Sequence, residues 1–210
     1  MIYSVKVNQG MFNSNLDKQI ELAAEAMIGG KIVAFPTDTV YGLGCSCKHD
    51  QAIADLYTIK ERPSGLRMPL LLADYSQIEQ VAPPLPAVAN ELAAKYWPGP
   101  LTMVVRCHPH INRRIIGDED TVAIRIPAHY VPRRLAKLVG TPIIGTSANR
   151  SGEAACVTYH EVNTSFPVGL AFILDGGVCD IGVESTIVDC TASKPRLVRL
   201  GALDITRDIG

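Results

Sequence analysis

The chain has 210 residues, of which 47% are hydrophobic and 20% are charged. This balance is typical of a globular protein, and the length is most simply explained by one domain. The formal net charge of −1 excludes a general electrostatic attraction to nucleic acid or to a membrane surface. Any site for an anion must therefore come from the local placement of Lys and Arg side chains.

The sequence gives no sign of export. It does not begin with a basic segment followed by a long apolar run, and no apolar stretch approaches the length of a membrane span. We therefore expect a cytoplasmic protein that does not associate with membranes. Its six cysteines are scattered, which predicts reduced thiols. Cys45 and Cys47 are close, but no second pair accompanies them, so no metal–thiolate site is predicted.

The N-terminal half of the chain predicts strands and helices in alternation. In chain order we expect a strand at residues 3–7, a helix at 13–28, a strand at 32–35, a helix at 50–60, a strand at 68–73, and helices at 76–81 and 87–96. The residues Asn13 to Asn15 are typical N-caps for the first helix, and Gly29 is typical of its C-terminal end. Pro63 ends the second helix, because proline disfavours helical backbone at the residue before it.

The C-terminal half predicts more strands than helices. In chain order we expect strands at residues 101–107 and 121–126, a helix at 129–139, a strand at 141–145, a helix at 161–165, and strands at 170–174, 186–189 and 196–200. No internal repeat or long linker divides the chain. We therefore predict an α/β fold in which residues 1–210 form a single domain around a mixed, twisted, open sheet.

The loop at residues 36–44 follows a buried strand and has the sequence PTDTVYGLG. Its glycines would let the backbone approach a ligand closely, and its hydroxyl groups can bind a phosphate or the charged groups of an amino acid. The end of a strand is also the usual place for a ligand in an open α/β sheet. The alternative is a tight turn in which Thr and Asp satisfy nearby backbone groups.

Two pairs of polar residues also come where an apolar strand or helix ends. Lys60 and Arg62 are two residues apart, as are Ser147 and Asn149. In an extended backbone such residues point to the same side, so each pair could face one ligand. Two cations beside neutral donors suit a polyanion such as a nucleotide triphosphate. The alternatives are favourable charge at a helix end for the first pair and a cap or Asx turn for the second.

Two further arginines have two interpretations each. Arg125 lies within an apolar strand, so it either points outward or binds a carboxylate. Arg199 near the C-terminus either contacts a phosphate or lies on the surface. The sequence has no P-loop, no Rossmann glycine pattern and no defensible Ser–His–Asp order. The chemistry is therefore expected to depend on binding and charge neutralisation rather than on a covalent nucleophile.

Eight short segments occur in a family-specific order between about residue 13 and residue 201. They are FPTDTVYGLG, IKERP, PLLLAD, WPGPLT, TVAIRIP, GTSANRSG, GVESTIVD and VRLGA. In this order they make the chain similar to the YrdC-like family of threonylcarbamoyl-adenylate synthases. The resemblance implies a twisted α/β sheet with a concave, positively charged cavity. Because the sequence ends at Gly210, it resembles the short, single-domain form of the family.

The resemblance also implies an activity. Such an enzyme joins L-threonine, bicarbonate and ATP into threonylcarbamoyl-adenylate and pyrophosphate. Partner proteins then transfer the threonylcarbamoyl group to an adenosine of certain tRNAs, and weak binding of tRNA or double-stranded RNA is included in the expectation. Magnesium is expected to arrive with ATP, held by phosphate oxygens and water rather than by protein ligands. No tightly bound organic cofactor is expected.

Carried over position by position, the resemblance implies roles for individual residues. Those on the threonine side are Thr39, Arg125, Gly145 and Ser185. Those on the ATP side are Arg62, Thr121, Ser147 and Arg199. Those implied to carry catalysis are Lys60, Arg62, Ser147 and Asn149. The chain departs from the family in the segment that ends at Ala73, where many members have a histidine.

Two alternatives to this function remain at the level of sequence. One is a non-catalytic RNA-binding module that uses the same basic concavity, although the net charge and the 6% of aromatic residues lend it little support. The other is a related enzyme that makes a carbamoyl-adenylate from a different amine.

Overall fold

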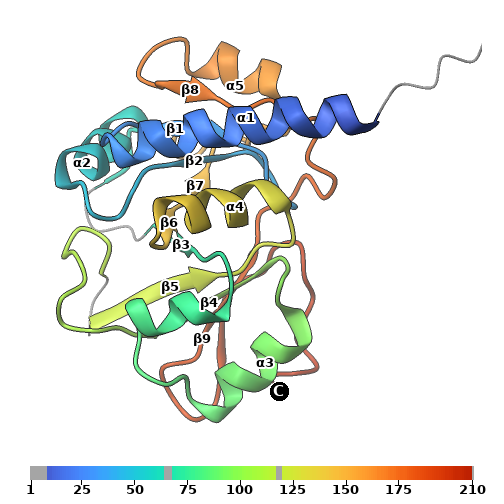
Figure 1. The fold of residues 1–210 in the computed structure, drawn as a ribbon. Helices are drawn as coiled ribbons and strands as arrows, with labels where there is room; N and C mark the ends of the chain where they lie inside the picture. Colours follow the sequence, from blue (N-terminus) through green and yellow to red (C-terminus); the bar gives the residue numbers. More distant parts are fainter. Residues whose placement is uncertain (1–8, 64–67, 117–119, 210) are drawn as a thin grey trace, which may run out of the picture.

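The computed structural model describes residues 9–63, 68–116 and 120–209 (Figure 1). The helices are α1 (Gln9–Ile28), α2 (Asp50–Ile59), the 3-10 helix η1 (Tyr75–Gln80), α3 (Ala87–Tyr96), α4 (Tyr130–Val139) and α5 (Tyr159–Ser165). The strands are β1 (Val33–Phe35), β2 (Gly42–Gly44), β3 (Leu70–Leu71), β4 (Leu101–Arg106), β5 (Thr121–Arg125), β6 (Ile143–Ile144), β7 (Thr146–Ser147), β8 (Phe172–Ile173), β9 (Thr186–Asp189) and β10 (Arg196–Arg199). The strand predicted at residues 3–7 lies outside the described residues.

The predicted α/β class with mixed strand directions is confirmed, but the strands divide between two sheets. One sheet has the order β7-β2-β1-β8 and the other the order β10-β9-β4-β5-β3-β6. Both are mixed, because β1 runs parallel to β8 and antiparallel to β2, while β4 runs parallel to β9 and antiparallel to β5. The two sheets lie above and below each other in Figure 1.

The expectation of a single sheet was wrong because the chain changes sheets directly after the strand predicted at residues 141–145. Strand β6, within that range, pairs with β3, whereas β7, which follows it, pairs with β2 in the other sheet. Gly145 lies between them and donates its N–H to the carbonyl of Pro69 over 3.0 Å. A Cβ atom at this position would lie 2.3 Å from Cδ1 of Leu71. Glycine therefore allows the chain to pass from one sheet to the other at a close approach.

A second correction concerns the loop predicted at residues 36–44, because its last three residues form β2. Gly42 pairs with Phe35 and Gly44 with Val33 in an antiparallel register. Gly44 also fits closely against the second sheet, since a Cβ atom there would lie 2.0 Å from the carbonyl oxygen of Ile144. Glycine has a low strand propensity, so this strand depends on tertiary packing rather than on local preference.

Helix α1 begins earlier than its predicted caps. It starts at Gln9, so the residues Asn13 to Asn15 lie inside the helix rather than at its N-terminus. Asn and Ser cost only a few tenths of a kcal/mol in a helix interior, so they do not by themselves stop a helix from extending. The predicted C-terminal end is confirmed, because the helix ends at Ile28 and Gly30 adopts a φ of 72°.

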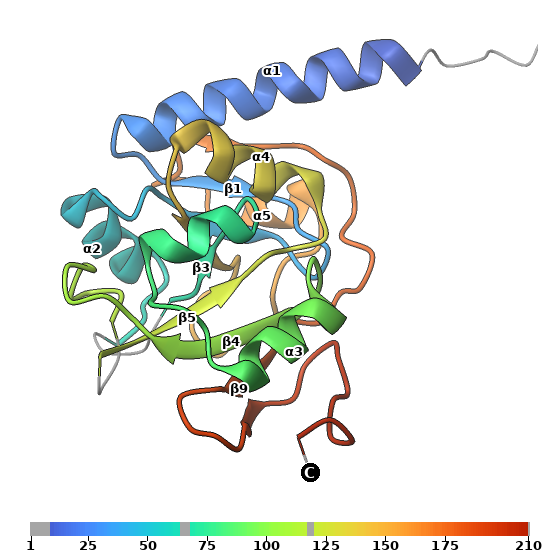
Figure 2. The same cartoon turned by 60° about the horizontal axis from the view of Figure 1, so that its bottom comes forward.

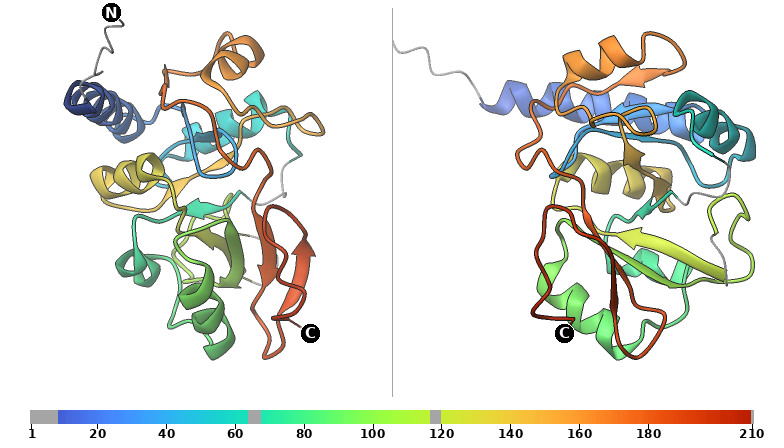
Figure 3. Two further views of the ribbon diagram at one scale, coloured as in Figure 1. Left: turned by 90° about the vertical axis from the view of Figure 1, so that its right-hand side faces the viewer. Right: turned by 180° about the vertical axis from the view of Figure 1, so that it is seen from behind.

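Apolar side chains form two core clusters. The smaller cluster includes Ile20 and Met27 of α1 and Leu135 of α4, which pack with Val33 and Phe35 of β1. Helices α1 and α4 accordingly lie side by side on one side of the molecule, and β9 and β10 lie on the opposite side (Figure 3). The larger cluster joins α2 and α3 to both sheets. All six cysteines are unpaired.

Candidate functional site

A cavity of about 350 Å³ lies between the two sheets. Strands β2 and β7 contribute to it from one sheet, and β3, β4, β5, β9 and β10 from the other. In the view of Figure 2, β1 of the first sheet lies above β3, β5, β4 and β9 of the second. The residues that line it are Thr37, Thr39, Val40, Tyr41, Gly42, Lys60, Arg62, Pro69, Leu71, Thr102, Arg125, Gly145, Thr146, Ser147, Asn149, Ser151, Gly152, Glu153, Glu184, Ser185, Ile187 and Arg199. This set contains four cationic and two carboxylate side chains.

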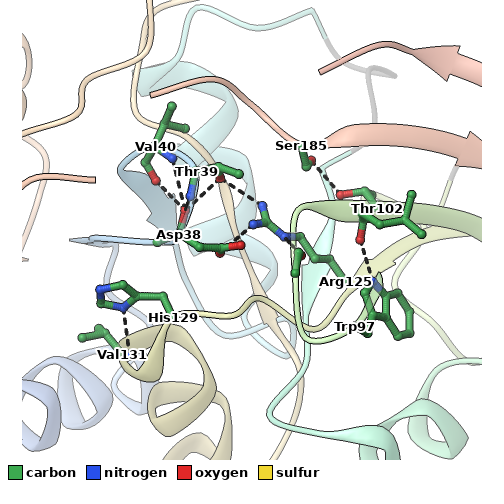
Figure 4. Close-up of polar contacts among 12 residues, drawn as sticks. Asp38, Thr39, Val40, Trp97, Thr102, Arg125, His129, Val131 and Ser185 are labelled. Atoms are coloured by element: carbon green, nitrogen blue, oxygen red, sulfur yellow. Dashed lines mark hydrogen bonds and ion pairs between the residues drawn. The ribbon is translucent and has the colours of Figure 1, made fainter. Parts of the chain in front are cut away.

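On one side of the cavity, Arg125 of β5 reaches toward the loop between β1 and β2 (Figure 4). Its Nη2 donates to Oδ1 of Asp38 over 2.6 Å, and its Nη1 donates to Oγ1 of Thr39 over 3.1 Å. Its Nε donates to the carbonyl of Gly99 over 2.9 Å. The arginine side chain is only 6% exposed. Of its two predicted interpretations, the one in which Arg125 binds a carboxylate is confirmed.

Hydroxyl groups surround this arginine. Those of Thr37 and Thr39 lie 2.9 Å apart, and those of Thr102 and Ser185 lie 2.8 Å apart. Thr102 and Ser185 come from β4 and from the segment before β9, and the cavity touches both. The predicted threonine-side residues Thr39, Arg125, Gly145 and Ser185 therefore all line one cavity.

The other side of the cavity is organised by Lys60, the residue after α2. Its Nζ donates to the carbonyl oxygens of Ser147 and Asn149 over 2.5 and 2.7 Å, and to Oδ1 of Asn149 over 3.1 Å. Only 1% of this residue is exposed. An ammonium group has three N–H donors, so all three have acceptors within the protein.

The predicted pairs line the cavity, but their backbone is not extended. Lys60 is helical, with φ −79° and ψ −7°, and Glu61 has a φ of 51°. Asn149 donates its N–H to the carbonyl of Ser147 over 3.1 Å, which is a tight turn. Both members of each pair therefore face one cavity, as expected, but turns rather than the extended backbone assumed from the spacing place them there.

The turn also brings Ser147 and Asn149 into contact with each other, while both line the cavity. The hydroxyl of Ser147 donates to Oδ1 of Asn149 over 2.7 Å. The amide nitrogen of Asn149 in turn donates to the carbonyl of Glu153 over 2.7 Å. The backbone N–H of Ser151 donates to the carbonyl of Lys60 over 2.9 Å. These bonds hold the segment after β7 against the C-terminal end of α2.

Arg199 of β10 adds a cation to the same cavity. Its Nη2 and Nε donate to the carbonyl of Ser185 over 2.7 and 3.3 Å, and its Nη1 lies 3.3 Å from the carboxylate of Glu184. The segment after it is held by Thr186, whose Oγ1 accepts from the N–H groups of Gly201 and Leu203. The fold thus places Arg199 beside Ser185 through backbone as well as side-chain contacts.

Burial changes the acidity of the two cations in the Lys-x-Arg segment. Burial, and to a smaller extent the nearby positive charge of Arg62, lower the pKa of Lys60 to about 8. Burial also lowers the pKa of Arg62. The guanidinium of Arg62 nevertheless stays charged, because its ordinary pKa lies above 12. Lys60 is therefore the cation in this cavity whose charge can change near neutral pH.

Two predicted features lie differently from expectation. Thr121 is buried at the start of β5 and is not among the described residues that line the cavity. It is four positions before Arg125, roughly 13 Å along a strand. In the segment where many family members have histidine, Leu71 lines the cavity, whereas Ala73 packs in the core cluster of α1 and α4.

Some lining or supporting residues had no role in the sequence prediction. Asp38 and Thr102 lie within the quoted segments FPTDTVYGLG and WPGPLT, so their position near the site could have been inferred from the resemblance. Glu184 lies in GVESTIVD in the same way. Nothing local marks Asp38 as the partner of Arg125, because 87 residues separate the two.

A second concavity, of about 1060 Å³, contains none of the predicted site residues. It lies around Cys47, Gln80 and Arg113. Within residues 9–63, 68–116 and 120–209, no three His, Cys, Asp or Glu side chains are grouped so that they could hold a metal ion. In the same part of the chain, no helix combines the length and apolar character needed to cross a bilayer.

Comparison with known proteins agrees with this geometry. Residues 25–201 match the Sua5–YciO–YrdC family model, which is described as "Telomere recombination". The chain is 40% identical over 187 residues to the threonylcarbamoyl-AMP synthase of Pyrococcus abyssi strain GE5/Orsay, covering 89% of this chain and 55% of that protein. It is 39% identical over 191 residues to the threonylcarbamoyl-AMP synthase of Bacillus subtilis strain 168, covering 90% and 55%.

A solved structure is also similar. The crystal structure of P. abyssi Sua5 complexed with L-threonine superposes with a TM-score of 0.86 at 40% identity, covering 91% of this chain and 57% of that one. The chain thus spans about half the length of the curated relatives it matches. Because the family match extends over residues 25–201, the chain belongs to the Sua5–YciO–YrdC family.

Proposed function

We propose that this protein joins L-threonine, bicarbonate and ATP into threonylcarbamoyl-adenylate and pyrophosphate. The observation that carries the proposal is one cavity with two differently built sides. One side has a buried arginine among hydroxyl groups, and the other has Lys60, Arg62 and the Ser147–Asn149 turn. The similarity to relatives named threonylcarbamoyl-AMP synthase supports the same reaction.

On the threonine side, Arg125 would neutralise the carboxylate of the amino acid. The hydroxyls of Thr39 and Ser185 and the backbone of Gly145 would orient the rest of the molecule. The uncharged threonine amine would attack the carbon of bicarbonate and form a carbamate with release of water. The lining on this side includes the hydroxyls of Thr39, Thr102 and Ser185. The carboxylate of Glu184 is paired with Arg199, which would leave the amine free to lose its proton.

On the nucleotide side, Arg62 and Arg199 would attract the triphosphate, and Lys60 with Asn149 would hold Ser147 beside it. A carbamate oxygen would attack the α-phosphorus, and the bond to the leaving pyrophosphate would break. Both reactants are anions, so cations that hold them together would supply much of the catalysis. Magnesium would enter with ATP as part of the substrate, coordinated by phosphate oxygens and water. Thr121 is not included, because it does not line the cavity.

The direct test incubates the purified protein with ATP, radiolabelled bicarbonate and L-threonine. The expected result is a labelled adenylate and pyrophosphate release that requires all three substrates. Arg62→Met should reduce this rate more than 100-fold, whereas Arg196→Met, an exposed arginine paired with Asp189, should leave it within 2-fold. Absence of labelled adenylate, while an active relative makes it under the same conditions, would overturn the proposal.

The same assay addresses the choice of amine. Replacing threonine with serine or other amines measures whether pyrophosphate release follows the hydroxyl and methyl groups of the threonine side chain. Equal rates with unrelated amines would mean that the enzyme does not select threonine, and the proposed substrate would then be a broader class of amines. Adding tRNA and the partner proteins of a related system then tests whether the product is used for tRNA modification.

A further inference from the structure

Asp38 occupies an unusual position beside the cavity. Its side chain is 12% exposed, and one carboxylate oxygen, Oδ1, accepts from Nη2 of Arg125 over 2.6 Å. The other oxygen, Oδ2, is buried and has no hydrogen-bond partner among the described residues. Asp38 itself is not among the residues that line the cavity. A buried carboxylate with half of its acceptors unused is not what stability alone would favour.

Asp38 restrains the side chain of Arg125. Three acceptors from two parts of the chain contact the guanidinium: Asp38 and Thr39 from the loop before β2, and the carbonyl of Gly99. A guanidinium has five N–H donors, so these three leave two for a ligand. Of the three acceptors, only Asp38 is charged. Its bond is therefore the strongest single restraint on where the two remaining donors point.

We infer that Asp38 is a positioning residue, which holds the fork of Arg125 in the orientation that receives the carboxylate of the amino-acid substrate. This inference rests on the proposed function, and it adds a residue that does not itself touch the substrate. Asp38 acts through Arg125, whose guanidinium also donates to the neighbouring Thr39. Removing its charge should therefore weaken binding on the threonine side and leave the nucleotide side unchanged.

The experiment is a double-mutant cycle read as threonine affinity by calorimetry and as KM for threonine and for ATP. Asp38→Asn keeps the shape and removes the charge, and Arg125→Gln removes the group through which Asp38 acts. Asp189→Asn is the matched control, because Asp189 also pairs with an arginine but lies outside the cavity lining. Asp38→Asn should raise the threonine Kd and KM at least 10-fold and change the ATP KM less than 2-fold.

The decisive comparison is made without Arg125. In the Arg125→Gln background, adding Asp38→Asn should change threonine affinity less than 2-fold, because the route from Asp38 to the substrate is gone. A further large loss there would overturn the inference, as would an unchanged threonine Kd in Asp38→Asn. If Asp38→Asn does not fold because it leaves Arg125 buried without a counter-charge, Asp38→Glu keeps the charge and displaces it by one methylene group, and an unchanged threonine Kd in that variant would overturn the inference.

The two hypotheses fail in different ways. A wild-type protein that binds threonine but releases no pyrophosphate would overturn the proposed function. The threonine affinities of the double-mutant cycle would still test the role of Asp38. A wild-type protein with full activity whose Asp38→Asn variant keeps its threonine KM would overturn the role of Asp38 alone. A loss of affinity in Asp189→Asn equal to that in Asp38→Asn would also overturn it, because the effect would then not be specific to the cavity.

Discussion

The ammonium nitrogen of Lys60 lies 2.5 Å from the carbonyl oxygen of Ser147, which is 87 residues further along the chain. This contact ties the C-terminal end of α2 to the end of β7, and two more bonds to Asn149 reinforce it. Lys60 therefore stabilises the part of the structure that lines the cavity, and it also contributes a positive charge to the cavity. Substitutions at this residue should affect folding and turnover together.

Lys60→Met should lower the free energy of unfolding by about 2–4 kcal/mol, because it removes three hydrogen bonds of a buried ammonium group and leaves the carbonyl of Asn149 without its donor. Chemical denaturation measures this change, and the pyrophosphate assay should show a loss of turnover as well. Lys95→Met is the control, since Lys95 makes an exposed ion pair with Asp208 whose loss should leave stability nearly unchanged. Equal stability of Lys60→Met and the wild type would contradict the structural role.

The pH dependence of stability should also reveal Lys60. Its pKa is about 8 in the folded protein, compared with 10.5 for an ordinary lysine. Between these values the unfolded chain binds more protons at this residue than the folded protein does, so its contribution to stability rises with pH. The unfolding free energy of wild type minus that of Lys60→Met should therefore increase from pH 8 to pH 10. A difference that stays constant or falls would show that the folded pKa is not lowered.

Gly145→Ala should strain the junction of the two sheets, because its Cβ atom would meet Cδ1 of Leu71. We expect a loss of about 1–3 kcal/mol from overpacking. Leu71→Ala alone should cost about 2–5 kcal/mol, as expected for a buried leucine. The double variant should lose less than the sum by at least about 1 kcal/mol, because the shortened side chain makes room for the new methyl group. Additive losses would mean that the two positions do not meet.

Thr186→Val should loosen the segment that follows β10. The hydroxyl of Thr186 accepts from two backbone N–H groups and donates to the carbonyl of Leu203, and the residue is fully buried. Valine keeps the shape and removes all three bonds, so we expect a loss of about 1–3 kcal/mol. Thr206→Val, at an exposed hydroxyl, should change stability by less than about 0.5 kcal/mol. Thermal unfolding of both variants makes the comparison.

Regular elements could be predicted where local pattern and burial agree. The apolar runs at residues 101–107 and 121–126 became β4 and β5, and the helix predicted at 87–96 is α3. The last case has apolar residues such as Leu92 and Ala93 on one buried face. Strand β2 could not be predicted, because three residues that include Gly42 and Gly44 carry no strand preference without β1 beside them.

Only the resemblance to the family predicted that the site residues lie together in one cavity. Lys60 and Arg62 do line one cavity, but the positive φ of Glu61 between them means that a turn, and not the extended backbone assumed from their spacing, places them there. The sequence also does not predict which carboxylate binds Arg125. The chain has 21 acidic residues, and the residues next to each of them do not distinguish one as the partner. Long-range contacts of this kind depend on the complete arrangement of both sheets.

The cavity draws on chain from Thr37 to Arg199, and this has a consequence for the newly made protein. Synthesis proceeds from the N-terminus, so Thr39 and Lys60 emerge long before the strand that carries Arg199. No partial chain can therefore present the complete set of cations to a nucleotide. Substrate binding becomes a property that appears only when the last strand has joined its sheet, and ligand-dependent protection from proteolysis would report the completion of folding.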